Sequence, residues 1–384
     1  MPSDPSAFVP PPYPHDRLGP VRATAAAVPG GMLDASVGTP VDPMPAVVLD
    51  ALAAAAPGAT GYPATIGSPA FRDAAVGWVE RRFGCPLTTD DVIACIGTKE
   101  VVASLPRMLS LRDPSRDTVL YPAVAYPTYE MGALLAGLRA VPVPVDDDWH
   151  LDLARVDPAD ADRALLLWLN DPSNPTGAVA SPQGMVDAVE WARARGVVVA
   201  SDECYAEFTY DAAGAPTAPV TALHAGADGV LVVHSLSKRS NMAGLRAGFV
   251  AGDRSLVGYL GEMRKHGGLM MPAPIQAAAA AALGDDEHVR EQQARYARRR
   301  AIALPALESR GLVHDGGSST FYLWLRDADR ARDGWAIAED LATTGLVVAP
   351  GDFYGTASTD HVRVALTLSD DQVQLLCERA ALSG

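Results

Sequence analysis

Short apolar runs alternate with amphipathic stretches through the middle of the chain. Continuous apolar runs bounded by glycine, proline or polar residues predict buried strands of a sheet that is covered on both faces. These runs lie at residues 92–96, 118–121, 164–169, 197–201, 229–234 and 247–251. Helical periodicity is found between them, at residues 101–111, 127–137 and 182–195. The alternation predicts an α/β fold with a mainly parallel, doubly wound sheet.

The pattern changes after about residue 272. A long charged helix, strand-like runs and two further helices follow, at residues 287–309, 320–325, 335–343, 346–348, 362–365 and the C-terminus. This order predicts a smaller α+β domain. We therefore expect a large domain over residues 41–275 and a small domain over residues 276–384, with the N-terminal segment 1–40 joining the small domain.

The composition of the chain limits the classes of molecule that we expect it to bind. The chain has 384 residues, of which 48% are apolar, and a net charge of -15. Because this charge repels nucleic acid and anionic membranes, we expect neither as a partner. Four separated cysteines, and a start without the pattern of a secretion signal, predict a cytoplasmic protein. The histidines lack metal-ligand spacing, so no metal is expected, and the proline-rich residues 1–16 are expected to be poorly ordered.

Polar residues follow most of the predicted strands. In an open α/β sheet, ligands bind beyond the carboxyl ends of the strands, so these residues are expected to share one site. The segments are 97–100, 126–127, 170–177, 202–205 and 235–238.

Lys238 lies among residues that suit a nucleophilic amine. A nearby cation such as Arg246, together with partial desolvation, would lower the pKa of the amine and favour attack on a carbonyl carbon. Ser235, Ser237 and Arg246 are suited to hold a phosphate. A helix that begins at Gly97 would add backbone N–H donors for the same anion.

Asp202 directly follows a buried strand, where an unpaired carboxylate is costly and needs a cationic partner. A protonated pyridine nitrogen is such a partner, worth about 4 kcal/mol at close range and an effective dielectric of about 20. Each feature alone has an ordinary structural explanation: Asp202 could cap a helix, Lys238 could be a solvated lysine, and residues 174–177 form a good turn. Their order along the chain favours a common site.

That order resembles the class I/II aminotransferases of fold type I over nearly the whole chain. The matching motifs are Asn174-Pro175-Thr176-Gly177, Asp202-x-x-Tyr205, Ser235-x-Ser237-Lys238 and Arg246. The resemblance implies pyridoxal 5'-phosphate as the cofactor, bound as a Schiff base to Lys238, which moves the proton during transamination. It also implies that Asp202 keeps the pyridine nitrogen protonated, so that the ring acts as an electron sink.

The resemblance assigns the other cofactor contacts as well. Tyr205 and Asn174 bind the 3-oxygen of the ring, and Tyr126 stacks on the ring face. The implied phosphate-binding residues are Gly97, Thr98, Lys99, Ser235, Ser237 and Arg246.

Matches towards the ends of the chain complete the implied site. Tyr62, in Gly61-Tyr62-Pro63, resembles a tyrosine that reaches the phosphate of the neighbouring subunit, which implies a homodimer with shared active sites. Arg363 resembles the family's C-terminal arginine, which binds the substrate α-carboxylate in bidentate fashion. Gly38 lies in a loop that resembles the cover of the same carboxylate. The implied substrate-binding residues are Gly38, Asn174 and Arg363, acting on amino acids and 2-oxo acids.

Longer strings resemble the actinobacterial N-succinyldiaminopimelate aminotransferases. They are residues 36–43, 61–67, 97–100, 125–130 and 349–355. The implied reaction exchanges an amino group between glutamate and N-succinyl-2-amino-6-oxopimelate, in lysine and diaminopimelate biosynthesis. Both substrates carry a carboxylate beyond the one assigned to Arg363, so a second cation is expected. The candidates are Lys99, Arg264, Lys265 and His266.

Other functions use the same cofactor motifs. An aminotransferase of another acidic, aromatic or prephenate-type substrate, or a C–S β-lyase, would present the same Schiff-base lysine. A transcriptional regulator with this fold would need an N-terminal DNA-binding module, for which an acidic, proline-rich lead of about 30 residues leaves no room.

Overall fold

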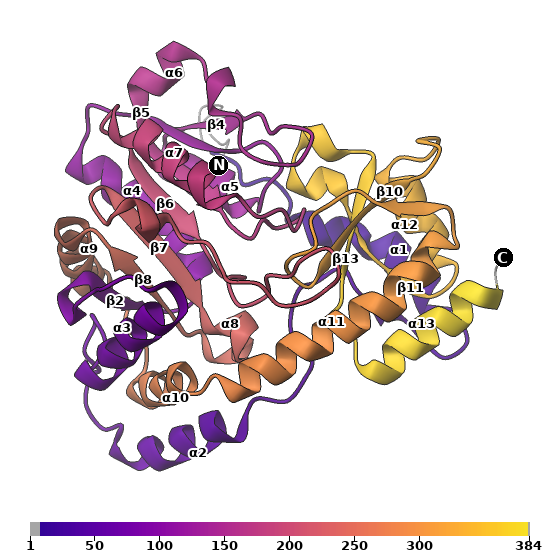
Figure 1. Ribbon diagram of the computed structural model, residues 1–384, viewed down its shortest axis with the longest axis horizontal. Helices are drawn as coiled ribbons and strands as arrows, with labels where there is room; N and C mark the ends of the chain where they lie inside the picture. The colour runs from indigo at the N-terminus through magenta and orange to yellow at the C-terminus, as the bar shows by residue number, and fades with distance from the viewer. Residues whose placement is uncertain (1–7, 383–384) are drawn as a thin grey trace, which may run out of the picture.

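The computed structural model describes residues 8–382, and in that part of the chain the strands form three sheets (Figure 1). The largest sheet has seven strands. From one edge to the other they are β2 (Val92–Cys95), β8 (Gly248–Gly252), β7 (Val230–Ser235), β6 (Val198–Asp202), β5 (Ala164–Asn170), β3 (Thr118–Pro122) and β4 (Arg139–Val143). Only β8 runs antiparallel to its neighbours. The predicted α/β fold with a mainly parallel sheet is therefore confirmed.

Helices cover both faces of this sheet. One face packs against α3 (Pro69–Phe83), α7 (Pro182–Arg193) and α10 (Ala273–Gly284), and the other against α4 (Thr98–Arg112), α5 (Thr128–Leu135) and α9 (Arg254–Gly267). Because side chains of a strand alternate between the faces, Leu231 joins the core beside α4 while Val232 joins the core beside α10. Two buried faces explain why the strands have nearly continuous apolar runs.

The sequence analysis does not predict several elements beside the sheet. They are α2 (Ala46–Ala55), α3, α6 (Pro158–Arg163), α9, α10 and β4. Alanine-rich α10 packs against both α2 and α3, so its apolar residues do not gather on one face. Strand β4 lies at the sheet edge with Arg139 and Pro142 exposed, and therefore lacks a continuous apolar run.

The second sheet is antiparallel and contains four strands. Their order is β12 (Ala349–Pro350), β13 (His361–Ala365), β10 (Tyr322–Asp327) and β9 (Leu312–His314). The long helix α11 (Glu287–Glu308) runs from the region of α10 towards this sheet and packs against α13 (Asp370–Leu382) (Figure 1). The predicted boundary between the two domains, at residue 275, lies inside α10. Helix α10 packs against α2 and α3, which lie on the larger sheet's side.

The N-terminal segment packs beside the second sheet. Helix α1 (Gly19–Ala26) contacts α12 (Gly334–Ala342), and β1 (Leu33–Asp34) pairs in parallel with β11 (Leu346–Val347). Residues 14–16 begin a 3-10 helix, so the prediction of a poorly ordered start is wrong for them, while residues 1–7 lie outside the described part. No helix among residues 8–382 is both long and apolar enough to span a bilayer.

Candidate active site

A cavity of about 470 Å³ lies at the carboxyl ends of the central strands. Asn170, Asp202 and Ser235 end β5, β6 and β7, and each lines this cavity. Thr98 enters from the start of α4, directly after β2. The strand ends thus meet at one edge of the sheet, as the sequence predicts, and residues of the second sheet and the N-terminal segment close the other side. The full set of predicted residues lining the cavity is Gly38, Thr98, Lys99, Tyr126, Asn174, Asp202, Tyr205, Ser235, Ser237, Lys238, Arg246 and Arg363.

Lys238 presents its amine to the middle of the cavity. It lies on the single-turn helix α8 (Leu236–Arg239), which begins where β7 ends. Its Nζ donates to the carbonyl oxygen of Gly38 from the N-terminal loop. Burial lowers the pKa of the Lys238 ammonium, and the cations Arg363 and Arg246 lower it further. The described residues provide no carboxylate within ion-pair distance, so this amine is available for chemistry.

Asp202 is 7% exposed and both of its carboxylate oxygens accept hydrogen bonds. Oδ2 accepts from the hydroxyl of Tyr129 at 2.9 Å, and Oδ1 accepts from the backbone N–H of Cys204 at 3.2 Å. Burial raises the pKa of Asp202, whereas the hydrogen-bond donors and, through space, the Lys238 ammonium lower it. A buried carboxylate held by neutral donors alone is suited to a cationic group of a bound molecule.

A group of small and cationic residues forms one end of the cavity. Ser235 caps α8 by accepting from the N–H of Ser237 at 3.1 Å, and both serines are 6% exposed. Arg246 lies opposite the start of α4. Gly97 itself does not line the cavity, but it has φ of 84°, and a Cβ there would collide with the Arg246 guanidinium. Glycine at this position therefore lets the cation approach the helix N-terminus, which favours an anion there.

Arg363 forms the opposite end of the cavity from a buried position on β13. Its Nη1 donates to Oδ1 of Asn174 at 2.8 Å, and its Nη2 donates to the carbonyl oxygen of Ser36 at 2.8 Å. The guanidinium also lies 4.0 Å from the ring centre of Tyr322. Arg363 is thus oriented by neutral groups and keeps its charge for an anionic ligand.

Tyr205 and Tyr322 join the two sides of the site. Their hydroxyl oxygens lie 2.8 Å apart, and both side chains are buried. Tyr322 also packs against Gly38, where a Cβ would overlap its hydroxyl. Tyr322 was not predicted from the sequence, because it is one of several aromatic residues in an apolar strand and follows no recognised motif.

The N-terminal segment contributes side chains that the sequence analysis missed. Tyr13 and His15 both line the cavity, although the proline-rich composition around them indicates disorder. Lys99 extends to the mouth of the cavity, where its Nζ lies 3.4 Å from the hydroxyl of Tyr13 and 4.9 Å from its ring centre. His15 lies 3.2 Å from the carbonyl oxygen of Ser36 through Nε2. Pairing of β1 with β11, in the separate two-stranded sheet, holds the N-terminal segment on this side of the molecule, and no local sequence motif predicts that pairing.

Other predicted residues lie elsewhere. Tyr62 is 96% exposed and does not line the cavity of its own chain. Arg264, Lys265 and His266, proposed above as contacts to a second carboxylate, lie on α9 and do not line the cavity. Arg264 is instead paired with Glu100 at 2.7 Å. These three candidates do not reach the cavity of their own chain, because α9 covers a face of the sheet and not the strand ends.

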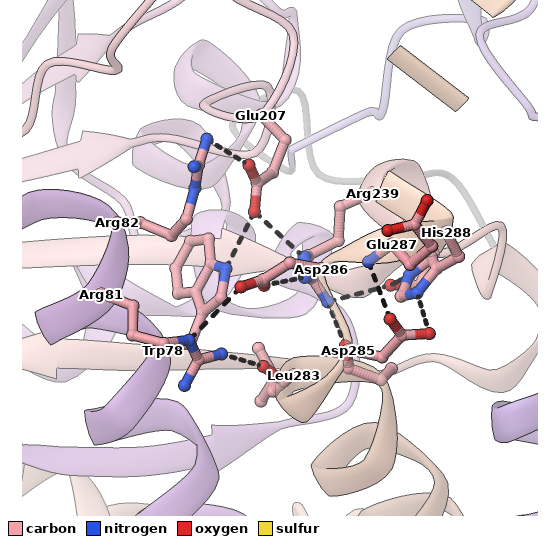
Figure 2. Close-up of polar contacts among 12 residues, drawn as sticks. Trp78, Arg81, Arg82, Glu207, Arg239, Leu283, Asp285, Asp286, Glu287 and His288 are labelled. Atoms are coloured by element: carbon pink, nitrogen blue, oxygen red, sulfur yellow. Dashed lines mark hydrogen bonds and ion pairs between the residues drawn. The ribbon is translucent and has the colours of Figure 1, made fainter. Parts of the chain in front are cut away.

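A polar cluster lies behind the lysine helix (Figure 2). Arg239 follows Lys238, is 3% exposed, and reaches Oε1 of Glu207 at 3.4 Å and the carbonyl oxygen of Ala282 at 2.8 Å. Glu207 also accepts from Nε1 of Trp78 at 2.8 Å and pairs with Arg82 at 2.8 Å. These contacts connect α8 and the segment after β6 to α3 and α10.

The arrangement fits pyridoxal 5'-phosphate. An amine with a lowered pKa, a buried carboxylate without an ion pair among the described residues, an anion-binding helix start and a carboxylate-binding arginine surround one cavity. The amine matches the aldehyde of the cofactor, and the buried carboxylate matches its pyridine nitrogen. The helix start matches the phosphate, and the arginine matches the carboxylate of the substrate. Among residues 8–382 no group of three or more His, Cys, Asp or Glu side chains is placed to hold a metal ion.

Comparisons with known proteins agree with this chemistry. The family model "Aminotransferase class I and II" matches residues 31–379. The chain is 47% identical over 369 residues to the probable aminotransferase Rv1178 of Mycobacterium tuberculosis, covering 94% of this chain and 83% of that one. It is 43% identical to the 4-dedimethylamino-4-oxo-anhydrotetracycline transaminase OxyQ of Streptomyces rimosus, covering 96% and 98%.

A solved structure described as a probable N-succinyldiaminopimelate aminotransferase from Thermus thermophilus superposes with a TM-score of 0.85. It is 30% identical, and the match covers 96% of this chain and 100% of that one. The chain therefore belongs to the class I and II aminotransferases, which transfer amino groups with pyridoxal 5'-phosphate.

Proposed function

We propose that Lys238 is the residue that binds the cofactor covalently and moves the proton. The cofactor supplies an electron sink that makes the α-hydrogen of a bound amino acid acidic. Burial lowers the pKa of Lys238, which favours the neutral amine that must accept this proton at Nζ. The Gly38 carbonyl oxygen directs Nζ towards the loop that covers the substrate.

The other predicted roles follow from position in the cavity. Asp202 would hold the protonated pyridine nitrogen, since it has no cationic partner of its own at close range. Thr98, Ser235, Ser237 and Arg246 would bind the phosphate beside the start of α4. Tyr205 and Asn174 would contact the ring's 3-oxygen, and Tyr126 the ring face, since all three line the same cavity.

The substrate of this site is proposed to be a dicarboxylic amino acid. Arg363 would bind the α-carboxylate, as its guanidinium is held by Asn174 and Ser36 without any carboxylate. Lys99 lines the same cavity, next to Tyr13, and would contact a second carboxylate. The presence of two separated cations, Arg363 and Lys99, in one cavity is the observation that supports a dicarboxylic substrate.

The reaction would be amino transfer between glutamate and N-succinyl-2-amino-6-oxopimelate, in lysine and diaminopimelate biosynthesis. The similarity to the Thermus thermophilus structure supports this substrate. The similarity to OxyQ favours a second candidate, a ketone of polycyclic aromatic character, because that relative is also matched over nearly its whole length. Arg363 and Lys99 together support the dicarboxylate.

An acceptor panel with glutamate as the donor tests the assignment. N-succinyl-2-amino-6-oxopimelate is expected to have the highest kcat/KM, ahead of prephenate, oxaloacetate and phenylpyruvate. Lys99→Met should lower kcat/KM for the succinylated acceptor by about tenfold, as for loss of one charged hydrogen bond. Lys265→Met is the matched control, because Lys265 is exposed and paired with Glu262 at 2.6 Å outside the cavity. Preference for phenylpyruvate, or equal effects of the two variants, would contradict the proposal.

We also propose a cytoplasmic homodimer in which Tyr62 reaches the neighbouring phosphate site. The exposure of Tyr62 and its distance from its own cavity support this role. Sedimentation equilibrium of the holoenzyme tests it, and a monomer that retains full activity would refute it.

A further inference from the structure

Tyr322 lies where three residues of the proposed active site meet. Its ring contacts the guanidinium of Arg363, and its hydroxyl contacts both the hydroxyl of Tyr205 and the backbone of Gly38. The side chain is 2% exposed and lines the catalytic cavity. The roles proposed above leave Tyr322 without a part in the reaction, although it contacts residues assigned to the cofactor and to the substrate.

The pairing of β10 with β13 places Tyr322 beside Arg363. Trp324 is directly opposite Arg363 in the register, and Tyr322 precedes Trp324 by two residues. Since side chains two residues apart point to the same face of a sheet, Tyr322 is the diagonal neighbour of Arg363 on that face. The guanidinium carbon lies 4.0 Å from the centre of the Tyr322 ring, whose π-electrons attract the cation. The ring therefore holds Arg363 without a carboxylate that would neutralise it.

The hydroxyls of Tyr205 and Tyr322 form a pair with one proton that the pair itself does not use. Their oxygen atoms lie 2.8 Å apart, and neither hydroxyl has another hydrogen-bond partner among residues 8–382. One hydroxyl donates to the other, so the second proton is free to bond with a ligand. Burial raises the pKa of Tyr205, so its hydroxyl keeps its proton at neutral pH. When Tyr205 donates this proton to the 3-oxygen of the cofactor, the bond within the pair must be donated by Tyr322.

We propose that Tyr322 is a positioning residue with two separate functions, an inference that rests on the roles proposed above for Tyr205 and Arg363. Its hydroxyl donates to Tyr205 and thereby directs the Tyr205 proton towards the 3-oxygen of the cofactor. Its ring face orients Arg363 towards the α-carboxylate of the substrate. Because the hydroxyl acts on the cofactor and the ring acts on the substrate, each function is removed by a different substitution.

The first experiment follows the visible cofactor band of the holoenzyme as a function of pH. A donor to the 3-oxygen withdraws negative charge from it, and this lowers the basicity of the nitrogen that joins the cofactor to Lys238. Tyr205→Phe, which removes the donor, should therefore move the midpoint of the band change to higher pH. Tyr322→Phe, which only weakens the donor, should move the midpoint in the same direction by less. The double variant should not exceed Tyr205→Phe, because both substitutions act through one hydroxyl.

The second experiment measures the binding of glutarate to the holoenzyme by isothermal titration. Glutarate is a dicarboxylate without an amino or keto group, so it binds without reacting. Tyr322→Phe keeps the ring and should leave the dissociation constant nearly unchanged. Tyr322→Leu removes the ring and should raise the dissociation constant by about tenfold, as for loss of a desolvated cation–π contact.

Tyr354→Phe is the matched control for both experiments. The Tyr354 ring also faces Arg363, at 5.0 Å from the guanidinium carbon, but its hydroxyl has no hydrogen-bond partner among residues 8–382. This variant should alter neither the midpoint of the cofactor band nor glutarate binding. If Tyr322→Leu fails to fold, Tyr322→Phe still decides the function of the hydroxyl.

The outcomes separate Tyr322 from the residues that it contacts. A shift in Tyr205→Phe without one in Tyr322→Phe overturns the hydroxyl function while the proposed role of Tyr205 stands, and no shift in either variant overturns both. Unchanged glutarate binding in Tyr322→Leu overturns the ring function. If Arg363→Ala also binds glutarate like the wild type, the role proposed for Arg363 fails with it.

Discussion

Lys238 and Arg239 are neighbours in the chain, yet their charges meet opposite surroundings. The Lys238 amine enters the catalytic cavity and donates to a carbonyl oxygen without any ion pair among the described residues. Arg239 extends to the other side of α8, into the cluster of Figure 2, where Glu207 and Asp286 lie at 3.4 and 3.8 Å. One cation is left without a counter-ion and the other is neutralised.

Asp202, which ends β6, and Glu207, in the segment after it, repeat this difference. Asp202 is bound only by neutral donors, whereas Glu207, five residues later, contacts Arg82 and Arg239. A charge that must interact with a ligand cannot already be neutralised by the protein, while a buried structural charge must be. In these two comparisons, the charges that line the catalytic cavity, Lys238 and Asp202, have no ion-pair partner among the described residues, whereas Arg239 and Glu207 have one.

The largest expected effect is the loss of catalysis in Lys238→Ala. Removing the general base and covalent anchor should lower kcat by at least about 10³-fold, and borohydride should no longer fix the cofactor to the chain. Because Lys238 forms no ion pair, the thermal midpoint of the cofactor-free protein should not fall. Lys265→Ala, which removes an exposed lysine, is the control for both measurements. A cofactor linkage that borohydride still reduces in Lys238→Ala would refute the assignment.

The second prediction concerns the polar cluster of Figure 2, where a substitution is expected to change the stability of the protein more than its catalytic constants. Glu207→Gln leaves Arg239 and Arg82 without their shared carboxylate, and removal of one partner of a buried pair costs about 3 kcal/mol. Urea unfolding should therefore show a lower midpoint, whereas KM for glutamate should change little. Glu262→Gln breaks an exposed pair and should leave the midpoint unchanged. A Glu207→Gln protein with wild-type stability would contradict the structural role.

The sequence predicts the sheet and the strand-end residues well because both depend on local patterns. Buried strands have continuous apolar runs, and Asp202 or Lys238 follow such runs directly. Arg239 and Glu207 could not be identified as partners, since their pairing depends on how α3 and α10 pack against the sheet. The same limit applies to Tyr13 and His15, which the N-terminal segment brings to the cavity from more than 200 residues away from Lys238 along the chain.

The smallest predicted effect concerns Tyr129, which was also missed. It is fully buried, stacks on Trp168 with ring centres 5.0 Å apart, and donates to Asp202 at 2.9 Å. Tyr129→Phe keeps the ring packing and removes only the hydroxyl, so kcat/KM should fall by about tenfold, the effect of one hydrogen bond to a charged acceptor.

The pH dependence distinguishes this positioning role of Tyr129 from a purely structural one. Burial raises the pKa of Asp202 and the Tyr129 hydroxyl lowers it, so removal of the hydroxyl raises it further. Because the reaction needs the ionised carboxylate, the acidic limb of the kcat/KM profile should move to higher pH. Tyr259→Phe is the matched control, since its hydroxyl donates at 2.9 Å to the Met108 carbonyl oxygen, away from the cavity. If both variants keep the wild-type pH profile, the Tyr129 hydroxyl does not hold Asp202 in its charged form. Neutral hydrogen-bond donors around a buried carboxylate would then not be sufficient evidence that the carboxylate acts in catalysis.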